Sequence, residues 1–330
     1  MLSPGLSMLW ESADAQRELP ERFGLDGIDA AARWLKEVLA EHWGITATAL
    51  PRLTLSDHNA IAWVTSDRGP LVVKWSGAAE RFPRLAATTR LLTHVAAHGI
   101  PVAEPLRARD GEVRVEADGP SGPLSLAVLP EVEGDWLDVT DLRTVHAAGA
   151  CLASLHRTLE EAELGGPAQD SPPPLADRVK GWLTERDPGR APEASAHLAA
   201  LLAQLPELEG SPQLIHGDYR AANLLVSEGR ITAVLDFDEV RHDHRIADLA
   251  QASTYLATLF RDWGPTPATA RAALRAGYES VRPLSPLEAD WLEALTLWMG
   301  IAAIPPGDDG RWTDAAGWGS HRRAPRLRSS

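Results

Sequence analysis

Apolar and polar positions follow two different spacings along this chain, one typical of strands in the first third and one typical of helices in the remainder. In the first third, short apolar runs bounded by turn residues predict strands, and two stretches with apolar residues three or four positions apart predict helices. The expected strands occupy residues 49–55, 60–65, 70–75, 106–109, 112–116 and 124–129. The expected helices occupy residues 28–43 and 84–98, and Gly99 and Pro101 end the second one.

Helical spacing dominates the rest of the chain. It covers residues 141–163, 175–186, 193–205 and 246–302, and a strand-rich patch at 213–237 interrupts it. From Pro305 onward the sequence is rich in Gly, Asp and finally Arg without clear periodicity, and we expect this tail to be partly mobile. A strand-rich beginning followed by a helical remainder predicts an α+β protein with an N-terminal lobe at 1–130 and a C-terminal lobe at 131–330.

Composition excludes some classes of protein. The chain has 330 residues and a formal charge of −14, which argues against a nucleic-acid binder and is compatible with a cationic substrate. The single cysteine, Cys151, rules out an internal disulfide and lies in an apolar helical stretch, where a core role is expected. The N-terminus lacks a basic region followed by an apolar run, and no segment approaches membrane-spanning length. We therefore expect a cytoplasmic protein without membrane contact.

Three polar residues gather around one predicted hairpin. A short strand delivers His216-Gly217-Asp218, Asn223 follows five residues after Asp218, and Asp236 emerges where the returning strand ends. Carboxylate and amide oxygens are ligands that suit a phosphate-bound magnesium ion, which fits Asn223 and Asp236. A carboxylate that orients a hydroxyl and accepts its proton fits Asp218. The pattern predicts a phosphoryl-transfer site.

The pattern His-Gly-Asp-x-x-x-x-Asn followed by Leu-Asp-Phe-Asp resembles the aminoglycoside phosphotransferase and choline kinase-like family, distant relatives of protein kinases. The resemblance implies that Asp218 is the catalytic base and that Asn223 and Asp236 hold Mg²⁺. It implies ATP as the phosphoryl donor, with GTP as the alternative. Arg220 takes the place where protein kinases often carry a lysine near the transferred phosphate, so it is a second catalytic candidate.

Three further segments carry the resemblance over most of the chain. Residues 149–156 are similar to the family's helix that ends in Leu-His, and residues 97–102 are similar to its junction after the first-lobe helix. Residues 246–250 match its Asp-Leu-Ala segment, in which Asp248 would be a structural brace. The order of these segments implies a bilobal protein-kinase-like fold with an antiparallel sheet in the smaller lobe.

Lys74 is the candidate for nucleotide binding, because it lies in an apolar strand of a chain that has few lysines. Pairing around the turn at 66–69 places it beside Ile61, near the loop at 56–59. This loop lacks glycine, so Ser56 is expected to contact phosphate. Residues 128–132 are the expected lobe connection, where Leu129 and Glu131 would bind adenine through backbone groups.

An acidic partner for this lysine is missing from its expected place. The helix position where relatives often carry Glu falls near Thr88, and residues 84–98 contain no Asp or Glu. Glu80 is the nearest candidate. Either it pairs with Lys74 or this acid–base pair is absent, and the first alternative is favoured.

Two alternatives from other classes stay open. A metal-dependent hydrolase would use residues 242–244 with His216 and Asp218, although adjacent histidines do not face the same way. A nucleotide-binding pseudokinase would explain the altered loop. A protein kinase is disfavoured, because a segment at about 157–212 with two helical patterns precedes the catalytic motif. Phosphate-loop kinases are excluded, because their Gly-x-x-x-x-Gly-Lys motif is absent from the sequence.

The sequence thus predicts an ATP- and Mg²⁺-dependent O-phosphotransferase that acts on a hydroxyl of a small polar molecule, cationic ones included. The favoured acceptor is an antibiotic, which would give the protein a role in antibiotic resistance. Homoserine, choline or sugar-like metabolites are the alternatives. A monomer and a homodimer are both compatible with the sequence. Five residues are candidates for the acceptor site, although a core or surface role is favoured for each of them: Asp238, Glu239, Asp243, Trp182 and Trp298.

Overall fold

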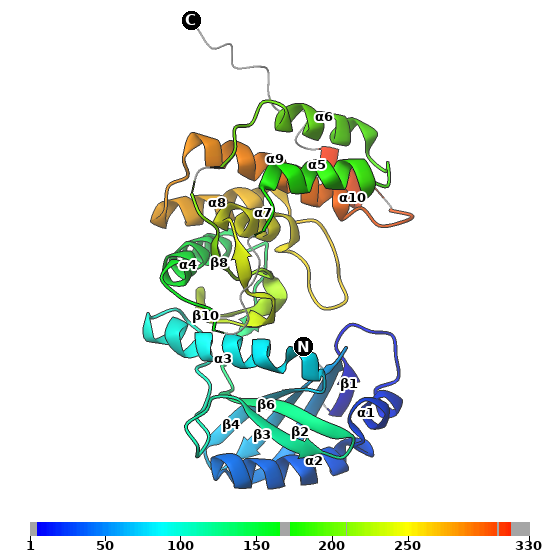
Figure 1. The fold of residues 1–330 in the computed structure, drawn as a ribbon, viewed down its shortest axis with the longest axis vertical. Coiled ribbons are helices and arrows are strands. Elements are labelled where there is room, and N and C mark those ends of the chain that lie inside the picture. The colour runs from blue at the N-terminus through cyan, green and yellow to red at the C-terminus, as the bar shows by residue number, and fades with distance from the viewer. Residues whose placement is uncertain (1–4, 166–171, 209, 309, 318–330) are drawn as a thin grey trace, which may run out of the picture. The chain divides into compact units, whose positions relative to one another are not determined.

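The computed structural model describes residues 5–165, 172–208, 210–308 and 310–317 (Figure 1). Their contacts divide into two compact units. Unit 1 takes the described residues of Met1–Gly134, Ala162–Pro167 and Thr232–Asp238. Unit 2 takes those of Asp135–Glu161, Ala168–Ile231 and Glu239–Ser330. Strands dominate the first unit and helices the second, so the predicted α+β class is confirmed.

Unit 1 is built on a six-stranded sheet with the order β1-β2-β3-β4-β6-β5. The first strand pairs parallel to the second, and the other neighbours are antiparallel. The strands are β1 (Gly5–Met8), β2 (Ala47–Ser56), β3 (Asn59–Ser66), β4 (Gly69–Ser76), β5 (Val115–Gly119) and β6 (Gly122–Pro130). The predicted turn between β3 and β4 is confirmed, since Ser66 pairs with Gly69 at the end of the ladder.

Helices cover both sides of this sheet (Figure 1). They are α1 (Ala15–Phe23), α2 (Gly27–Val38) with the one-turn π-helix η1 (Leu39–Trp43), the 3₁₀ turn η2 (Ala79–Arg81) and α3 (Phe82–Ala97). The apolar stripe of α2 forms one core with the sheet, where Leu35 is buried together with Leu53 and Val73. Periodicity therefore predicted α2 and α3 well, whereas β1 and α1 were missed.

One predicted strand of unit 1 is wrong. Residues 106–109 form no ladder, and isolated hydrogen bonds hold them, among them those from Leu106 N–H to Val128 O, from Ala108 N–H to Glu112 O and from Arg109 N–H to His42 O. The chain turns there through Gly111, which has a φ of 91°. This turn also delays the next strand, which begins at Val115 instead of residue 112.

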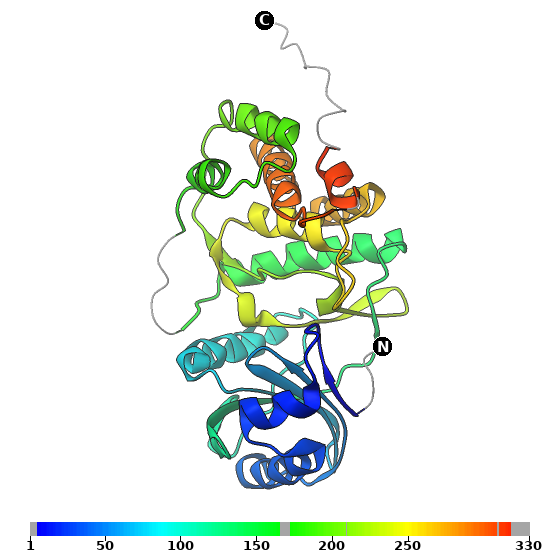
Figure 2. The ribbon, with the colours of Figure 1, turned by 90° about the vertical axis from the view of Figure 1, so that its right-hand side faces the viewer.

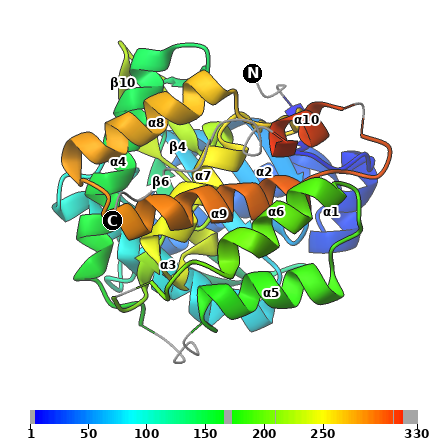
Figure 3. The ribbon, with the colours of Figure 1, turned by 90° about the horizontal axis from the view of Figure 1, so that it is seen from above.

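Unit 2 is mainly helical. Its helices are α4 (Leu142–Glu160), α5 (Leu175–Glu185), α6 (Pro192–Leu202), α7 (Arg245–Tyr255), α8 (Ala268–Val281), α9 (Pro286–Ala302) and α10 (Arg311–Gly317). The views in Figures 2 and 3 show α7 packed against α9, with α6 on the outer side of α9 and α5 beside α6. The predicted helical segments are confirmed, and α10 adds a helix to the tail that was expected to lack one. Residues 318–330 lie outside the described part.

Helices α4 and α8 approach each other backbone to backbone. A Cβ atom at Gly149 would collide with the carbonyl oxygen of Leu274, and one at Gly277 would collide with that of His146. Two opposed glycines therefore fix the spacing of these helices. The same two helices carry His156 and Tyr278, which support residues 216–223, here named the catalytic segment for the role predicted for Asp218.

Five short strands complete the fold. β7 (Asp135–Trp136), β9 (Leu224–Ser227) and β10 (Arg230–Val234) form a sheet with the order β10-β9-β7. β8 (Gln213–Ile215) pairs antiparallel with β11 (Arg241–Asp243) and leads directly into the catalytic segment. None of the described helices has the length and apolar character needed to cross a membrane.

Candidate active site

The catalytic segment begins where β8 ends, and a buried carboxylate fixes its start. Asp248 of α7 accepts the N–H of His216 at 2.9 Å and the N–H of Gly217 at 3.0 Å. Gly217 has a φ of 81°, and a Cβ atom there would collide with Glu239 O, so only glycine suits this position. The expected role of Asp248 as a brace agrees with these bonds.

Asp248 is itself held by a second layer of side chains. Its Oδ2 accepts from Nε2 of buried His156 at 3.0 Å, and Nδ1 of that ring lies 2.9 Å from the hydroxyl oxygen of Tyr278. Burial by itself would raise the pKa of Asp248, but the bonds from His156 and the Gly217 N–H bring it below its ordinary value. The carboxylate therefore stays ionised and accepts all three bonds at neutral pH.

The structure brings Asp218, Arg220 and Asn223 together. Nε of Arg220 donates to both carboxylate oxygens of Asp218, at 2.9 and 3.0 Å. Nδ2 of Asn223 donates to the backbone oxygen and to Oδ2 of Asp218, both at 2.8 Å. The carboxylate is thus oriented from two sides, and its side chain is 24% exposed. A fixed and partly accessible carboxylate is what a general base requires.

A second polar cluster, in unit 1, surrounds Lys74. The predicted register is confirmed, since Lys74 of β4 pairs with Ile61 of β3. Its Nζ donates to Oδ1 of Asp236 at 2.9 Å and lies 3.9 Å from Oδ2 of Asp238. Burial would lower the pKa of Lys74, but the two carboxylates outweigh this and raise it above its ordinary value. The ammonium group is therefore permanently charged.

The expected pairing of Lys74 with Glu80 is wrong. Glu80 is exposed on η2, and the carboxylates that pair with Lys74 among the described contacts are those of Asp236 and Asp238. A helical glutamate is thus replaced by residues that follow β10. Asp238, one of the acceptor-site candidates, faces this lysine.

Arg114 also belongs to this cluster and was not among the residues predicted for the site. Its guanidinium donates to Oγ and O of Ser125 at 2.8 and 3.0 Å and to Oγ1 of Thr89 at 3.3 Å. Burial lowers the pKa of Arg114 to about 10, and Asp238 opposes that shift. A single arginine between Val113 and Val115 was the one signal in the sequence, and it does not identify a partner.

The other predicted nucleotide contacts lie in unit 1 with Lys74. Ser56 is buried at the end of β2 opposite Asn59, and Leu129 of β6 pairs with Val72. The N–H of Glu131 is already donated to Pro70 O, so its carbonyl is the backbone group that remains for adenine. Nucleotide binding by these residues stays a prediction.

The residues predicted to hold magnesium suit that ion chemically. Both bonds from the Asn223 amide nitrogen go to Asp218, which leaves its oxygen Oδ1 without a hydrogen bond among the described contacts. Asp236 offers a carboxylate. No group of three or more His, Cys, Asp or Glu side chains in the described ranges could hold a metal alone. One or two oxygen ligands fit magnesium, which normally completes its shell with substrate phosphates and water.

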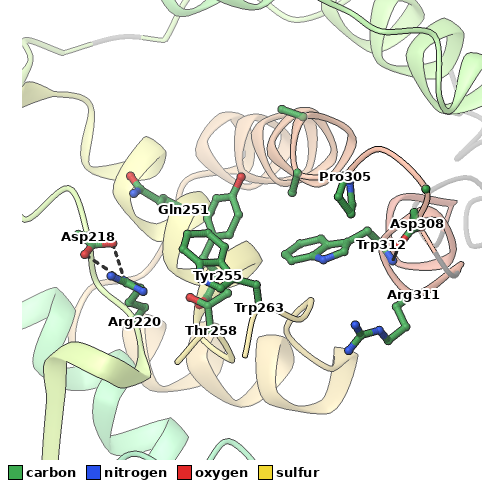
Figure 4. A pocket seen from close by; sticks show the side chains of 13 residues that line it. Asp218, Arg220, Gln251, Tyr255, Thr258, Trp263, Pro305, Asp308, Arg311 and Trp312 are labelled. Atoms are coloured by element: carbon green, nitrogen blue, oxygen red, sulfur yellow. Dashed lines mark hydrogen bonds and ion pairs between the residues drawn. The ribbon is translucent and has the colours of Figure 1, made fainter. Parts of the chain in front are cut away.

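A cavity of about 760 Å³ in unit 2 opens beside Asp218 (Figure 4). Asp218 and Arg220 lie at one end, aromatic side chains lie in the middle, and Arg311 lies at the far end. The full lining consists of Asp218, Arg220, Gln251, Tyr255, Thr258, Trp263, Ala302, Ala303, Pro305, Gly307, Asp308, Arg311 and Trp312. Its position next to the candidate base makes it the candidate acceptor pocket.

The five acceptor-site candidates lie outside this pocket, and the contacts of Asp243, Trp182 and Trp298 agree with the structural roles that were favoured for them. Buried Asp243 forms a two-pronged ion pair with Arg178, at 2.7 and 2.8 Å, and so holds α5 to β11. Trp182 and Trp298 pack against each other with ring centroids 6.4 Å apart. Glu239 is exposed beside the catalytic segment. The pairing of Asp243 also removes the central residue from the metal cluster that a hydrolase would need.

Solved structures similar to this chain define its fold class. An aminopropanol kinase associated with a microcompartment aligns with a TM-score of 0.61 and 20% identity, over 87% of this chain and 94% of that one. The macrolide 2'-phosphotransferase MphH from Brachybacterium faecium aligns with a TM-score of 0.61 and 19% identity, over 89% and 99% of the two chains. An amicoumacin kinase aligns with a TM-score of 0.56 and 16% identity, over 92% of this chain and 94% of that one. The fold is that of the protein-kinase-like small-molecule kinases.

The family follows from the sequence. A profile of the phosphotransferase enzyme family matches residues 55–284, and the chain belongs to this family. The homoserine kinase of Gluconacetobacter diazotrophicus is 32% identical over 207 residues, which are 60% of this chain and 61% of that protein. The homoserine kinase of Caulobacter sp. is 33% identical over 213 residues, which are 62% of this chain and 63% of that protein. The chain thus spans less than two thirds of the length of these relatives.

Proposed function

We propose that this protein transfers the γ-phosphoryl group of ATP to a hydroxyl of a small molecule. The observation that carries the proposal is the carboxylate of Asp218, held by Arg220 and Asn223 at one end of a cavity of about 760 Å³. Pockets for small-molecule ligands usually measure about 300–1,000 Å³, so this cavity has room for a drug-sized acceptor.

The reaction follows from this placement. Asp218 accepts a hydrogen bond from the acceptor hydroxyl. The oxygen of this hydroxyl attacks the γ-phosphorus while the bond from that phosphorus to the ADP oxygen breaks. The hydroxyl proton passes to the Asp218 carboxylate and then to solvent. Arg220 donates to this carboxylate through Nε and thereby orients the base. Its place in the motif supports a second role, in which its positive charge would stabilise the transferred phosphoryl group.

The nucleotide side of the proposal rests on unit 1. Lys74 supplies a permanent positive charge for ATP phosphates, with Ser56 near the same loop and the backbone of Leu129 and Glu131 for adenine. Asn223 and Asp236 would hold the magnesium ion, which supplies charge neutralisation on the phosphate oxygens. ATP is preferred over the GTP alternative, because the amicoumacin kinase structure contains an ATP analogue and nothing favours GTP.

Two acceptor classes are supported by different relatives. The amicoumacin kinase and the macrolide phosphotransferase share the fold and favour an antibiotic acceptor. The homoserine kinases share more sequence and favour a metabolite. The second class is the specific alternative to an antibiotic kinase.

The test is incubation of the full chain with ATP, Mg²⁺ and a panel of antibiotics, homoserine and amino alcohols, followed by mass spectrometry. The proposal predicts an acceptor whose mass increases by one phosphoryl group, and no such product with Asp218→Asn. Binding of ATP without turnover of any acceptor would indicate a pseudokinase. A wild-type protein that neither binds nucleotide nor modifies an acceptor would refute the proposal.

A further inference from the structure

Three neighbouring aromatic rings, inclined to one another by 68° and 50°, line the middle of the acceptor pocket and are named the aromatic wall (Figure 4). Tyr255 lies at the centre, with its ring centroid 6.4 Å from that of Trp263 and 5.9 Å from that of Trp312. The hydroxyl of Tyr255 donates to Met299 O at 3.3 Å, so its polar end is tied to α9 and its ring stays with the wall. Such a wall fits the apolar face of a ring better than an open chain.

Trp263 is the accessible member of this wall. Its side chain is 53% exposed, whereas Trp312 is 4% exposed. It comes from the loop between α7 and α8, and the guanidinium of Arg220 lies over its ring, 5.6 Å from the centroid. A ligand ring placed against Trp263 would therefore be covered by an apolar surface close to the catalytic base.

The charges of the pocket balance. Its lining contains two carboxylates, Asp218 and Asp308, and two guanidinium groups, Arg220 and Arg311. Asp218 is paired with Arg220, and Asp308 accepts from the N–H and the hydroxyl of Thr313 at 2.9 and 2.7 Å. A polycationic acceptor needs several carboxylates that face it, so this lining disfavours such a molecule although the whole chain carries a charge of −14.

Much of the pocket lies outside the region shared with the family. The family profile ends at residue 284, whereas seven lining residues follow it. They are Ala302, Ala303, Pro305, Gly307, Asp308, Arg311 and Trp312. The acceptor of a relative therefore cannot be assigned to this chain from the residues matched by the family profile alone, because more than half of the pocket lining lies beyond them.

These observations lead to one inference about the acceptor. We infer that it is a ring-bearing alcohol with at most one net positive charge, whose ring packs against Trp263. This deepens the proposed function and rests on it. The hydroxyl next to the ring attacks the γ-phosphorus, ADP leaves with the electrons of the broken bond, and the proton goes to Asp218. Homoserine leaves the aromatic wall uncovered, and a polycationic aminoglycoside brings more charge than the lining balances.

The test measures binding as well as turnover, so that it does not depend on the transfer reaction. The probes are erythromycin and phenyl β-glucoside as ring-bearing alcohols, hygromycin B as a polycation, and homoserine as a small zwitterion. Each is titrated by calorimetry into the wild type, Trp263→Ala and Trp10→Ala. Trp10 is a matched control, because it is 45% exposed and belongs to unit 1.

The inference predicts that at least one ring-bearing probe binds the wild type at least tenfold more tightly than hygromycin B or homoserine. Trp263→Ala then weakens that probe by about tenfold, as expected for loss of a stacked ring, and Trp10→Ala has no effect. The inference would be overturned if hygromycin B or homoserine bound more tightly than the ring-bearing probes, or if neither ring-bearing probe bound. It would also be overturned if the affinity for the ring-bearing probe were unchanged in Trp263→Ala. Phosphorylation of homoserine that survives in Trp263→Ala would overturn the inference and leave the proposed function standing.

Discussion

The buried carboxylate of Asp248 offers the sharpest prediction about stability. It accepts three hydrogen bonds, from the backbone of His216 and Gly217 and from the ring of His156, and it is fully buried. In Asp248→Asn an amide N–H₂ replaces one oxygen and faces at least one of these donors. Losing charge-assisted bonds and leaving a buried donor unpaired costs about 3 kcal/mol. The catalytic segment is anchored here, so activity falls with stability.

The assay is urea or thermal unfolding of Asp248→Asn beside Asp29→Asn. Asp29 is exposed on α2, and its replacement is expected to change the free energy of unfolding by less than about 0.5 kcal/mol. Because the unfolding entropy is about 2.1 cal/mol/K per residue, a loss of about 3 kcal/mol in a chain of 330 residues lowers the unfolding temperature by roughly 4 °C. A variant as stable as the control would refute the bracing role of Asp248.

The same residue predicts a pH dependence. Its pKa in the folded protein lies below the ordinary value, so its contribution to stability is complete above the unfolded pKa of about 3.9. The contribution is lost as the pH falls through the lower folded pKa. When the pH is lowered from 5 to below the folded pKa of Asp248, the free energy of unfolding should therefore fall less for Asp248→Asn than for the wild type, as measured by urea unfolding at each pH.

Two other predictions concern packing and catalysis. Gly149→Ala places a methyl group against the backbone of α8 and should cost about 3 kcal/mol, whereas Gly181→Ala, with nothing within 4 Å, should gain up to about 1 kcal/mol; equal unfolding midpoints would contradict the close approach of α4 and α8. Arg220→Met should lower the turnover number about 100-fold and leave the Kd for ATP within about threefold, because Arg220 orients the base; an unchanged turnover number removes it from the mechanism.

The parts of the fold that were predictable follow local rules. The ladder that places Lys74 beside Ile61 follows from strand alternation and one turn, and the helix α3 follows from apolar spacing and a Gly-Pro stop. The catalytic segment was predictable because Asp218 and Asn223 are close in sequence. In each case the interacting residues lie within one hairpin, one helix or one short loop.

The missed features depend on residues that are far apart in sequence. The strand β1 has four residues and gains its place by pairing with β2, and α1 contains Pro20, which weakens its helical signal. The partners of Lys74 come from beyond β10, whereas spacing pointed to Glu80. The acceptor pocket joins the catalytic segment to Trp312 in the tail, and no local pattern marks that contact.

One kinetic measurement tests the central claim most directly. Acceptor-dependent release of ADP is followed for the wild type, Asp218→Asn and the exposed control Asp29→Asn, with binding of ATP measured on the same samples. We predict that Asp218→Asn lowers the turnover number by about 10²–10⁴-fold while ATP still binds and the control stays at the wild-type rate. A folded Asp218→Asn protein that releases ADP at the wild-type rate would contradict the assignment of this site.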